Sequence, residues 1–172
     1  AERDQSYFLF ATTPEQLDFL EATLASSRAT WKVVALHHPP YSAGYQGSHL
    51  PTRELFEPIF RRHGVDLVLS AHDHDYQRSV PIGGVTYIVT GGAARARFSG
   101  TAPFTAVSFR VRHYVDIAAS PDQLIVRAVD HDALVVDEVV LAACASQSVP
   151  ASSLHGDDQV PGIEAPAGSR PR

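Results

Sequence analysis

The sequence predicts an α/β fold in which strand–helix–strand units form a parallel sheet and an antiparallel meander follows. Residues 31–36 and 65–70 are short, mostly apolar runs, which are typical of buried parallel strands. Each run comes after a segment whose apolar residues recur at helical spacing. After residue 85, by contrast, strand-like runs follow one another with only turns between them, which predicts antiparallel pairing.

The first unit begins with an apolar strand candidate at residues 6–10. A helix is expected to follow, because Thr13 can serve as its N-cap, Pro14 fits the first helical position and Gln16 completes a capping box. The unit ends with the buried strand at residues 31–36. Two prolines soon follow this strand and terminate it, since proline has no backbone donor for a sheet.

The second unit begins with a helix expected over residues 52–63. Its apolar residues form one stripe, and Gly64 is its C-terminal stop. Pro58 lies inside this segment, so we expect a kink or a late helix start there. The second buried strand, residues 65–70, comes next, and right-handed crossovers place the strands of these units in one parallel sheet.

The residue pattern of the later part of the chain predicts several strands followed by a tail. The pattern of apolar residues ends at about residue 142, and the remainder is rich in Pro, Ser, Gly and Ala. We therefore expect one domain segment over residues 1–142 and a disordered tail over residues 143–172. The later strands are expected at residues 85–90, 106–117, 123–129 and 134–141.

Composition excludes some classes of partner. The 172 residues have a formal net charge of −5, which gives no electrostatic reason to expect nucleic acid or an anionic membrane as a partner. No apolar run approaches the roughly 18 residues that span a bilayer. Cys144 is the only cysteine, so no disulfide can form within the chain.

The chemistry is expected where the two buried strands end. His37 follows the first strand, and His72 and His74 follow the second. In extended chain the side chains of residues i and i+2 share a face, so His72 and His74 can converge while Asp73 faces away. Open α/β sheets form their sites outside the carboxyl ends of their strands. Several imidazoles at such an edge predict a metal site.

Three segments, residues 37–41, 71–78 and 87–92, resemble the calcineurin-like metallophosphoesterases in order and spacing. The family pattern is a histidine before a proline-containing turn and then glycine-histidine-x-histidine, and here Ala71 replaces that glycine. The branch that looks most similar is the purple acid phosphatase type found in bacteria. The resemblance implies that residues 1–142 are the C-terminal half of a metallophosphoesterase β-sandwich flanked by helices.

The resemblance also implies a function, namely hydrolysis of phosphate monoesters at a two-metal site in the complete enzyme. The implied cofactors are two divalent or trivalent ions, Fe, Zn or Mn, because imidazole binds all three metals. The implied partners are a phosphorylated small-molecule or protein substrate and the missing N-terminal half of the domain. A secreted or periplasmic location is expected on the same ground.

By position, the resemblance implies that His37 and His72 ligate the second metal and that His74 ligates the first. His38 matches a position that is not a ligand in the family. Two other residues, His49 and Arg78, are catalytic candidates.

For His49 the expected role is substrate contact or general acid, although the histidine that often has this role in the family falls at Gln46 in this sequence. Arg78 either binds the phosphate or forms a cap or a surface ion pair.

Counting ligands predicts an incomplete site. Asp73 and Asp75 lie on the opposite face by strand parity, and the family motifs that supply the bridging aspartate belong upstream of residue 1. The alternative to an enzyme is therefore a catalytically incomplete fragment or a non-enzymatic remnant that binds at most one metal ion. Four other histidines are expected to be structural or incidental: His63, His113, His131 and His155.

Overall fold

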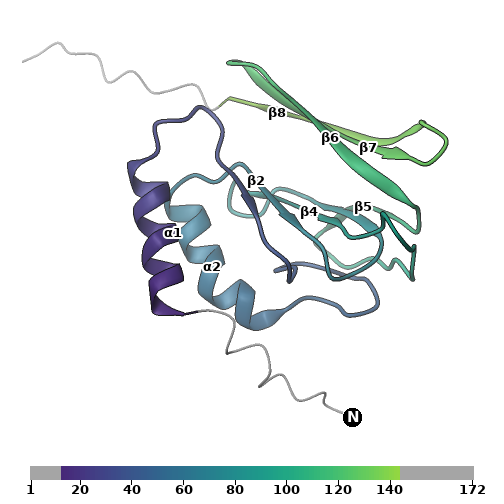
Figure 1. The fold of residues 1–172 in the computed structure, drawn as a ribbon, viewed down its shortest axis with the longest axis horizontal. Helices are drawn as coiled ribbons and strands as arrows, with labels where there is room; N and C mark the ends of the chain where they lie inside the picture. The colour runs from purple at the N-terminus through teal and green to yellow at the C-terminus, as the bar shows by residue number, and fades with distance from the viewer. Residues whose placement is uncertain (1–12, 144–172) are drawn as a thin grey trace, which may run out of the picture.

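The computed structural model describes residues 13–143, which form two helices and two sheets (Figure 1). The strand expected at residues 6–10 and nearly all of the expected tail, residues 144–172, lie outside the described residues. The helices are α1 (Pro14–Ser26) and α2 (Leu50–Arg62). The strands are β1 (Val33–Ala35), β2 (Leu67–Ser70), β3 (Tyr76–Ser79), β4 (Thr86–Thr90), β5 (Thr105–Phe109), β6 (His113–Ala119), β7 (Gln123–Asp130) and β8 (Val135–Ala142).

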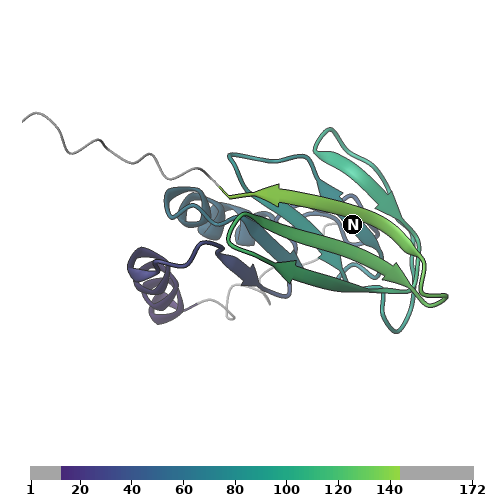
Figure 2. The ribbon, with the colours of Figure 1, turned by 90° about the horizontal axis from the view of Figure 1, so that it is seen from above.

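The two sheets confirm the α/β class and the antiparallel meander. One sheet has the order β1-β2-β4-β3-β5, in which β1, β2 and β4 run parallel and β3 pairs antiparallel with β4 and β5. The other sheet is the meander β6-β7-β8. It lies across one face of the five-stranded sheet, and the helices pack on the opposite face (Figures 1 and 2).

Strand β2 lies between two hydrophobic clusters, because neighbouring side chains of a strand point to opposite faces. Val68 packs in the cluster beneath the helices, together with Leu24 and Phe60. Leu67 packs in the cluster between the sheets, together with Leu124. The five-stranded sheet is thus covered on both faces, so a functional site can lie only at the ends of its strands.

Helix α1 starts as predicted. The backbone N–H of Gln16 donates to Oγ1 of Thr13 at 3.4 Å, and the backbone N–H of Thr13 donates to Oε1 of Gln16 at 3.3 Å. This is the reciprocal capping box that the sequence indicates. Neither α1 nor α2, the two helices of the described residues, has the length and apolar character needed to cross a bilayer.

Helix α2 begins at Leu50, so the expected late start is wrong. His49 caps the helix, because its Nδ1 accepts the backbone N–H of Thr52 at 3.2 Å. Pro51 is tolerated in the first turn, where backbone donors have no helical partner. The helix then continues through Pro58 to its last turn.

Strand β1 is shorter and more exposed than the buried strand expected over residues 31–36. It covers only Val33–Ala35, and Val33 is 43% exposed. In the part of the chain that the structure describes, β1 is the outermost strand of its sheet and pairs only with β2. The apolar run reflects a strand, but its burial depends on neighbours that the sequence pattern does not specify.

The single strand expected over residues 106–117 is wrong, because the chain divides there into two strands of different sheets. β5 ends at Phe109 and pairs with β3, whereas β6 begins at His113 and pairs with β7. The link between them contains apolar Val111, so the apolar pattern continues across a change of sheet. Strand β3, residues 76–79, was not expected from the sequence.

Candidate metal centre

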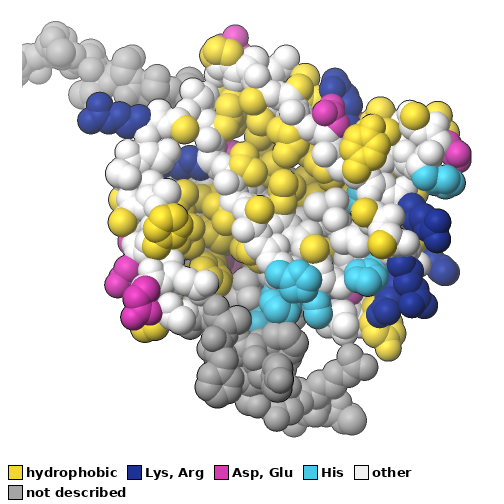
Figure 3. All heavy atoms as spheres, viewed as in Figure 1, with side chains coloured by type: hydrophobic (Ala, Val, Ile, Leu, Met, Phe, Trp, Pro, Cys, Tyr) yellow, Lys and Arg dark blue, Asp and Glu magenta, His cyan; other side chains and the backbone are white. Residues whose placement is uncertain are grey.

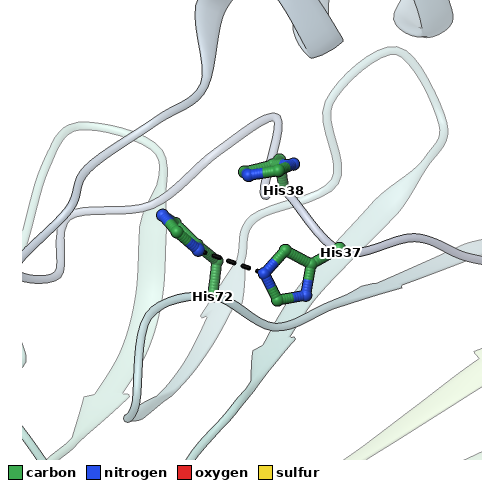
Figure 4. Close-up of side chains that lie close together, drawn as sticks. All are labelled: His37, His38 and His72. Carbon is green, nitrogen blue, oxygen red and sulfur yellow. Dashed lines mark hydrogen bonds between the residues drawn. The ribbon is translucent and has the colours of Figure 1, made fainter. Parts of the chain in front are cut away.

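Two adjacent parallel strands deliver the first histidines to one edge of the sheet. Pairing continues past the strand ends, since the N–H of Leu36 donates to the carbonyl of Leu69 at 3.0 Å and the N–H of Ala71 donates to the carbonyl of His37 at 3.0 Å. This pairing places His72 beside His37, and Nε2 of His37 lies 3.1 Å from Nδ1 of His72 (Figure 4).

His38 joins these two residues in a cluster of three imidazoles. One ring nitrogen from each of His37, His38 and His72 lies within 4.8 Å of the others. The ring centroids of His38 and His72 are 4.7 Å apart, and the ring of His49 lies 4.8 Å from that of His38. We call His37, His38 and His72 the histidine cluster (Figure 4).

The segment that holds His72 is a tight loop, so the expected extended geometry is wrong. His72 has a φ of 62°, in the left-handed region that side chains other than glycine rarely adopt. The N–H of Asp73 donates to the carbonyl of Ala71 at 2.7 Å. The loop packs tightly on the backbone of Gly91, where a Cβ atom would lie 2.2 Å from the carbonyl oxygen of Asp73. Such backbone strain is concentrated at functional sites.

As a result, strand parity does not describe the relation between His72 and His74. His74 lies outside the histidine cluster. Its Nδ1 is buried and has no hydrogen-bond partner among the described residues. Buried polar atoms nearly always have partners, so this nitrogen is available to a ligand such as a metal ion.

Asp73 is turned away from the histidine cluster and holds a neighbouring loop. One carboxylate oxygen, Oδ2, accepts the hydroxyl of Ser42 at 2.5 Å and the N–H of Gly47 at 3.1 Å, and the other accepts the N–H of Gln46 at 2.7 Å. Asp73 is only 1% exposed. Its carboxylate therefore positions the loop at residues 41–49 and is not presented to the histidines.

The electrostatics favour neutral imidazoles in this region. Burial, followed by the nearby His72, His49 and His37, lowers the pKa of His38 to about 4. Burial, followed by His37, also lowers the pKa of His72. Burial, followed by His72, lowers the pKa of His49. Neutral imidazole is the form that binds metals.

The residues present fit a metal ion. Two imidazole nitrogens bound tetrahedrally to one zinc ion lie roughly 3.3 Å apart, given Zn–N distances near 2.0–2.1 Å. The separation of 3.1 Å between His37 and His72 is close to that value. The described residues place no carboxylate in the histidine cluster, so the cluster by itself offers only nitrogen ligands.

The two catalytic candidates lie in different surroundings. His49 borders the histidine cluster beside His38. Arg78, by contrast, points between the two sheets, where its Nε and one terminal nitrogen donate to the carboxylate of Asp137 at 2.7 Å and 2.9 Å. Of the three roles considered for Arg78, these contacts correspond to an ion pair, but the pair is mostly buried and not on the surface as expected.

His38 is the site residue that sequence reasoning missed. It follows His37 directly, yet the family pattern set it aside as a position without a ligand. The available signal was the double histidine before two prolines, because a stiff turn fixes both rings near one point.

The other histidines have structural or incidental settings. His63 lies 2.6 Å from a carboxylate oxygen of Glu21, and His113 lies 3.0 Å from the hydroxyl of Thr90. His131 is exposed on the turn between β7 and β8, and His155 lies outside the described residues. Asp130 and Asp132 flank His131, but Oδ1 of Asp130 accepts backbone N–H groups of its own turn.

We expect the metal-free chain to lose stability as the pH falls from about 6.5 toward 4, and His38 to account for part of this loss. Because the pKa of His38 is lower in the folded chain, the unfolded chain binds more protons between these values, and acid favours unfolding. Urea unfolding above and within this window measures the effect. His38→Gln should lose less stability on acidification, and an equal loss in both proteins would contradict the assignment.

Sequence comparison finds relatives for the first part of the chain. A family model described as calcineurin-like phosphoesterase matches residues 3–76. An acid phosphatase from Aspergillus ficuum is 40% identical over 72 residues, which cover 40% of this chain and 12% of that protein. Purple acid phosphatase 17 from Arabidopsis thaliana is 36% identical over 81 residues, which cover 47% of this chain and 24% of that protein. The matched part therefore spans less than a third of each of these two relatives.

Structural comparison extends the similarity to most of the chain. A purple acid phosphatase from yellow lupin (Lupinus luteus) seeds superposes with a TM-score of 0.69 and 23% identity. The superposition covers 84% of this chain and 32% of that chain. The two sheets and the loops that carry the histidines thus belong to a fold that is shared with that protein.

Proposed function

Because residues 3–76 match the calcineurin-like phosphoesterase family model, we propose that this chain supplies histidine ligands to a two-metal site that hydrolyses phosphate monoesters. One observation carries the proposal: Nε2 of His37 and Nδ1 of His72 lie 3.1 Å apart at the carboxyl ends of adjacent parallel strands. The acid phosphatase relatives support the reaction class.

His37 and His72 would hold one ion through the two ring nitrogens that face each other. The buried Nδ1 of His74 is the nitrogen that we assign to the other ion. When bound, two ions stabilise the phosphoryl oxygens and lower the pKa of a bound water. The identity of the metals is left open between Fe, Zn and Mn, since imidazole accepts each of them.

His49 is proposed to contact the substrate. Its Nδ1 accepts the backbone N–H of Thr52, so the neutral ring carries its proton on Nε2. The lowered pKa keeps the ring neutral, which makes this N–H a hydrogen-bond donor beside the histidine cluster. Asp73 supports that position by fixing the loop that precedes His49.

A further ligand-bearing segment is part of the proposal. A two-metal phosphatase needs oxygen ligands that bridge and neutralise its ions, and the histidine cluster contains none. The alternative is a fragment or a non-enzymatic remnant that binds at most one ion. The carboxylate of Asp73 is engaged by the loop at residues 41–49, so it does not supply these oxygen ligands.

Metal loading and hydrolysis test the proposal together. The chain of 172 residues, equilibrated with zinc or manganese and freed of excess metal, should retain at most one ion and hydrolyse p-nitrophenyl phosphate weakly. A longer natural form with the bridging aspartate should retain two ions and hydrolyse this ester rapidly. Two tightly held ions in the 172-residue chain would contradict the claim that its metal site is incomplete. An inactive longer form would contradict the proposed phosphatase function.

The proposed substrates are phosphorylated small molecules or proteins, and the proposed location is secreted or periplasmic. Similarity to acid and purple acid phosphatases supports both statements. Fractionation of the native host cells, with hydrolysis of p-nitrophenyl phosphate as the readout, tests the location.

A further inference from the structure

An arginine-rich pocket of about 470 Å³ opens beside the loop that carries the histidines. The chain has a net charge of −5 and only 14 Lys and Arg residues, so three arginines around one pocket are a notable concentration of positive charge. Figure 3 shows Lys and Arg side chains gathered near histidines on this face of the molecule. The pocket is lined by Tyr45, Arg95, Ala96, Arg97, Phe98 and Arg110.

The walls of this arginine pocket are tied to the histidine loop on both sides. The backbone N–H of Arg97 donates to the carbonyl of His74 at 2.6 Å. On the other side, Asp73 binds the N–H groups of the two residues that follow Tyr45. The Arg97 guanidinium lies 5.7 Å from the centre of the Tyr45 ring. The pocket therefore has a defined position next to His74.

The arginines of the pocket have no acidic partners within the part of the chain that the structure describes. Among residues 13–143, no carboxylate lies within 4.0 Å of Arg95, Arg97 or Arg110, although Arg78 and Arg127 both have such partners. Within the same residues, the buried Nε of Arg97 has no hydrogen-bond partner. Guanidinium groups without a carboxylate beside them are suited to bind an anionic ligand.

We propose that the arginine pocket binds a second phosphate group, carried by the leaving group of the substrate. This inference rests on the proposed function, because it takes the histidines as the place where the first phosphate reacts. Guanidinium groups bind phosphate through paired, charge-assisted hydrogen bonds. The pocket volume of about 470 Å³ lies within the range of roughly 300–1,000 Å³ that is typical of small-molecule sites.

The aromatic rims narrow the class of substrate to nucleoside diphosphates and similar molecules. Tyr45 is 57% exposed and Phe98 is 61% exposed, so both rings are open to a planar group. A nucleobase can stack on such rings, while the phosphate nearer the sugar binds the arginines. The terminal phosphate would then be directed to the histidine side of the pocket.

Binding of inorganic pyrophosphate to the metal-free chain tests the pocket without any need for catalysis. Titration calorimetry at about pH 8 keeps the histidines neutral, so that they contribute little to anion binding. The triple variant Arg95→Gln/Arg97→Gln/Arg110→Gln should bind pyrophosphate at least about tenfold more weakly, because it loses charge-assisted contacts. The control Arg28→Gln/Arg62→Gln/Arg127→Gln removes the same charge elsewhere and should stay within about threefold of the parent.

Equal losses of pyrophosphate affinity in the two triple variants would contradict the proposed phosphate site. A parent chain that does not bind pyrophosphate would also contradict it. In a longer, active form, the pocket variant should also lower the preference for adenosine diphosphate over p-nitrophenyl phosphate about tenfold. Hydrolysis of p-nitrophenyl phosphate without pyrophosphate binding would reject the pocket and leave the phosphatase proposal intact. Pyrophosphate binding that only the pocket variant loses, with no hydrolysis in any form, would support the pocket and reject the phosphatase proposal.

Discussion

Replacing His72 with alanine should strongly lower phosphate ester hydrolysis in any form of the protein that has this activity. His72 contacts His37 at 3.1 Å, and the loop that holds His72 has a strained backbone. Loss of a residue that merely supports a metal ligand already costs about 10- to 100-fold in affinity or activity, so loss of the ligand itself should lower kcat/KM by more than about 100-fold. Metal content and kcat/KM for p-nitrophenyl phosphate measure the effect.

His131→Ala is the matched control, because His131 is exposed on the turn between β7 and β8 and its side chain is 67% accessible. Its metal content and activity should equal those of the parent. Retention of metal by His72→Ala, with kcat/KM within about tenfold of the parent, would refute the ligand assignment.

A second pair of variants tests whether His74 or His38 contributes more to metal binding. The family resemblance assigns His74, whereas the geometry places His38 in the histidine cluster. We expect His74→Ala to lose more metal than His38→Ala, because Nδ1 of His74 is buried and has no partner among residues 13–143.

Replacing Arg78 with alanine should strongly destabilise the fold. Arg78 on β3 and Asp137 on β8 join the two sheets through hydrogen bonds of 2.7 Å and 2.9 Å, and the hydroxyl of Tyr76 donates to the same carboxylate at 2.7 Å. Only 17% of the Arg78 side chain and 9% of the Asp137 side chain are exposed. Removal of one partner leaves a mostly buried charge uncompensated, so the free energy of unfolding should fall by about 3 kcal/mol or more.

Arg127→Ala is the control within the three-stranded sheet. Arg127 pairs with Glu138 at 2.6 Å, but the two side chains are 32% and 46% exposed, so water screens this ion pair. Its removal should cost about 1 kcal/mol or less. Urea unfolding of both variants measures the difference, and equal losses would show that the Arg78–Asp137 pair does not link the sheets as described.

Local sequence patterns predict only part of the geometry of the candidate metal centre. Histidines that directly follow two apolar runs are visible in the sequence, and parallel pairing of those runs brings His37 and His72 together. The geometry within residues 71–75 was not visible, because strand parity applies only to extended chain. His72 has its left-handed conformation in a loop that packs closely on the backbone of Gly91, a segment distant in the sequence.

The sequence by itself determined the class of fold, the capping box of α1, the antiparallel meander and the histidines at the strand ends. These features depend on residues that are near one another in the chain, so spacing and propensity suffice to predict them. Tertiary structure alone decided that β1 is the outermost strand of its sheet within the described residues, that β5 and β6 belong to different sheets, and that Arg78 pairs with Asp137. It also decided that His38 joins the histidine cluster while His74 does not. Each of these outcomes depends on which distant segments pack together, and local pattern does not contain that information.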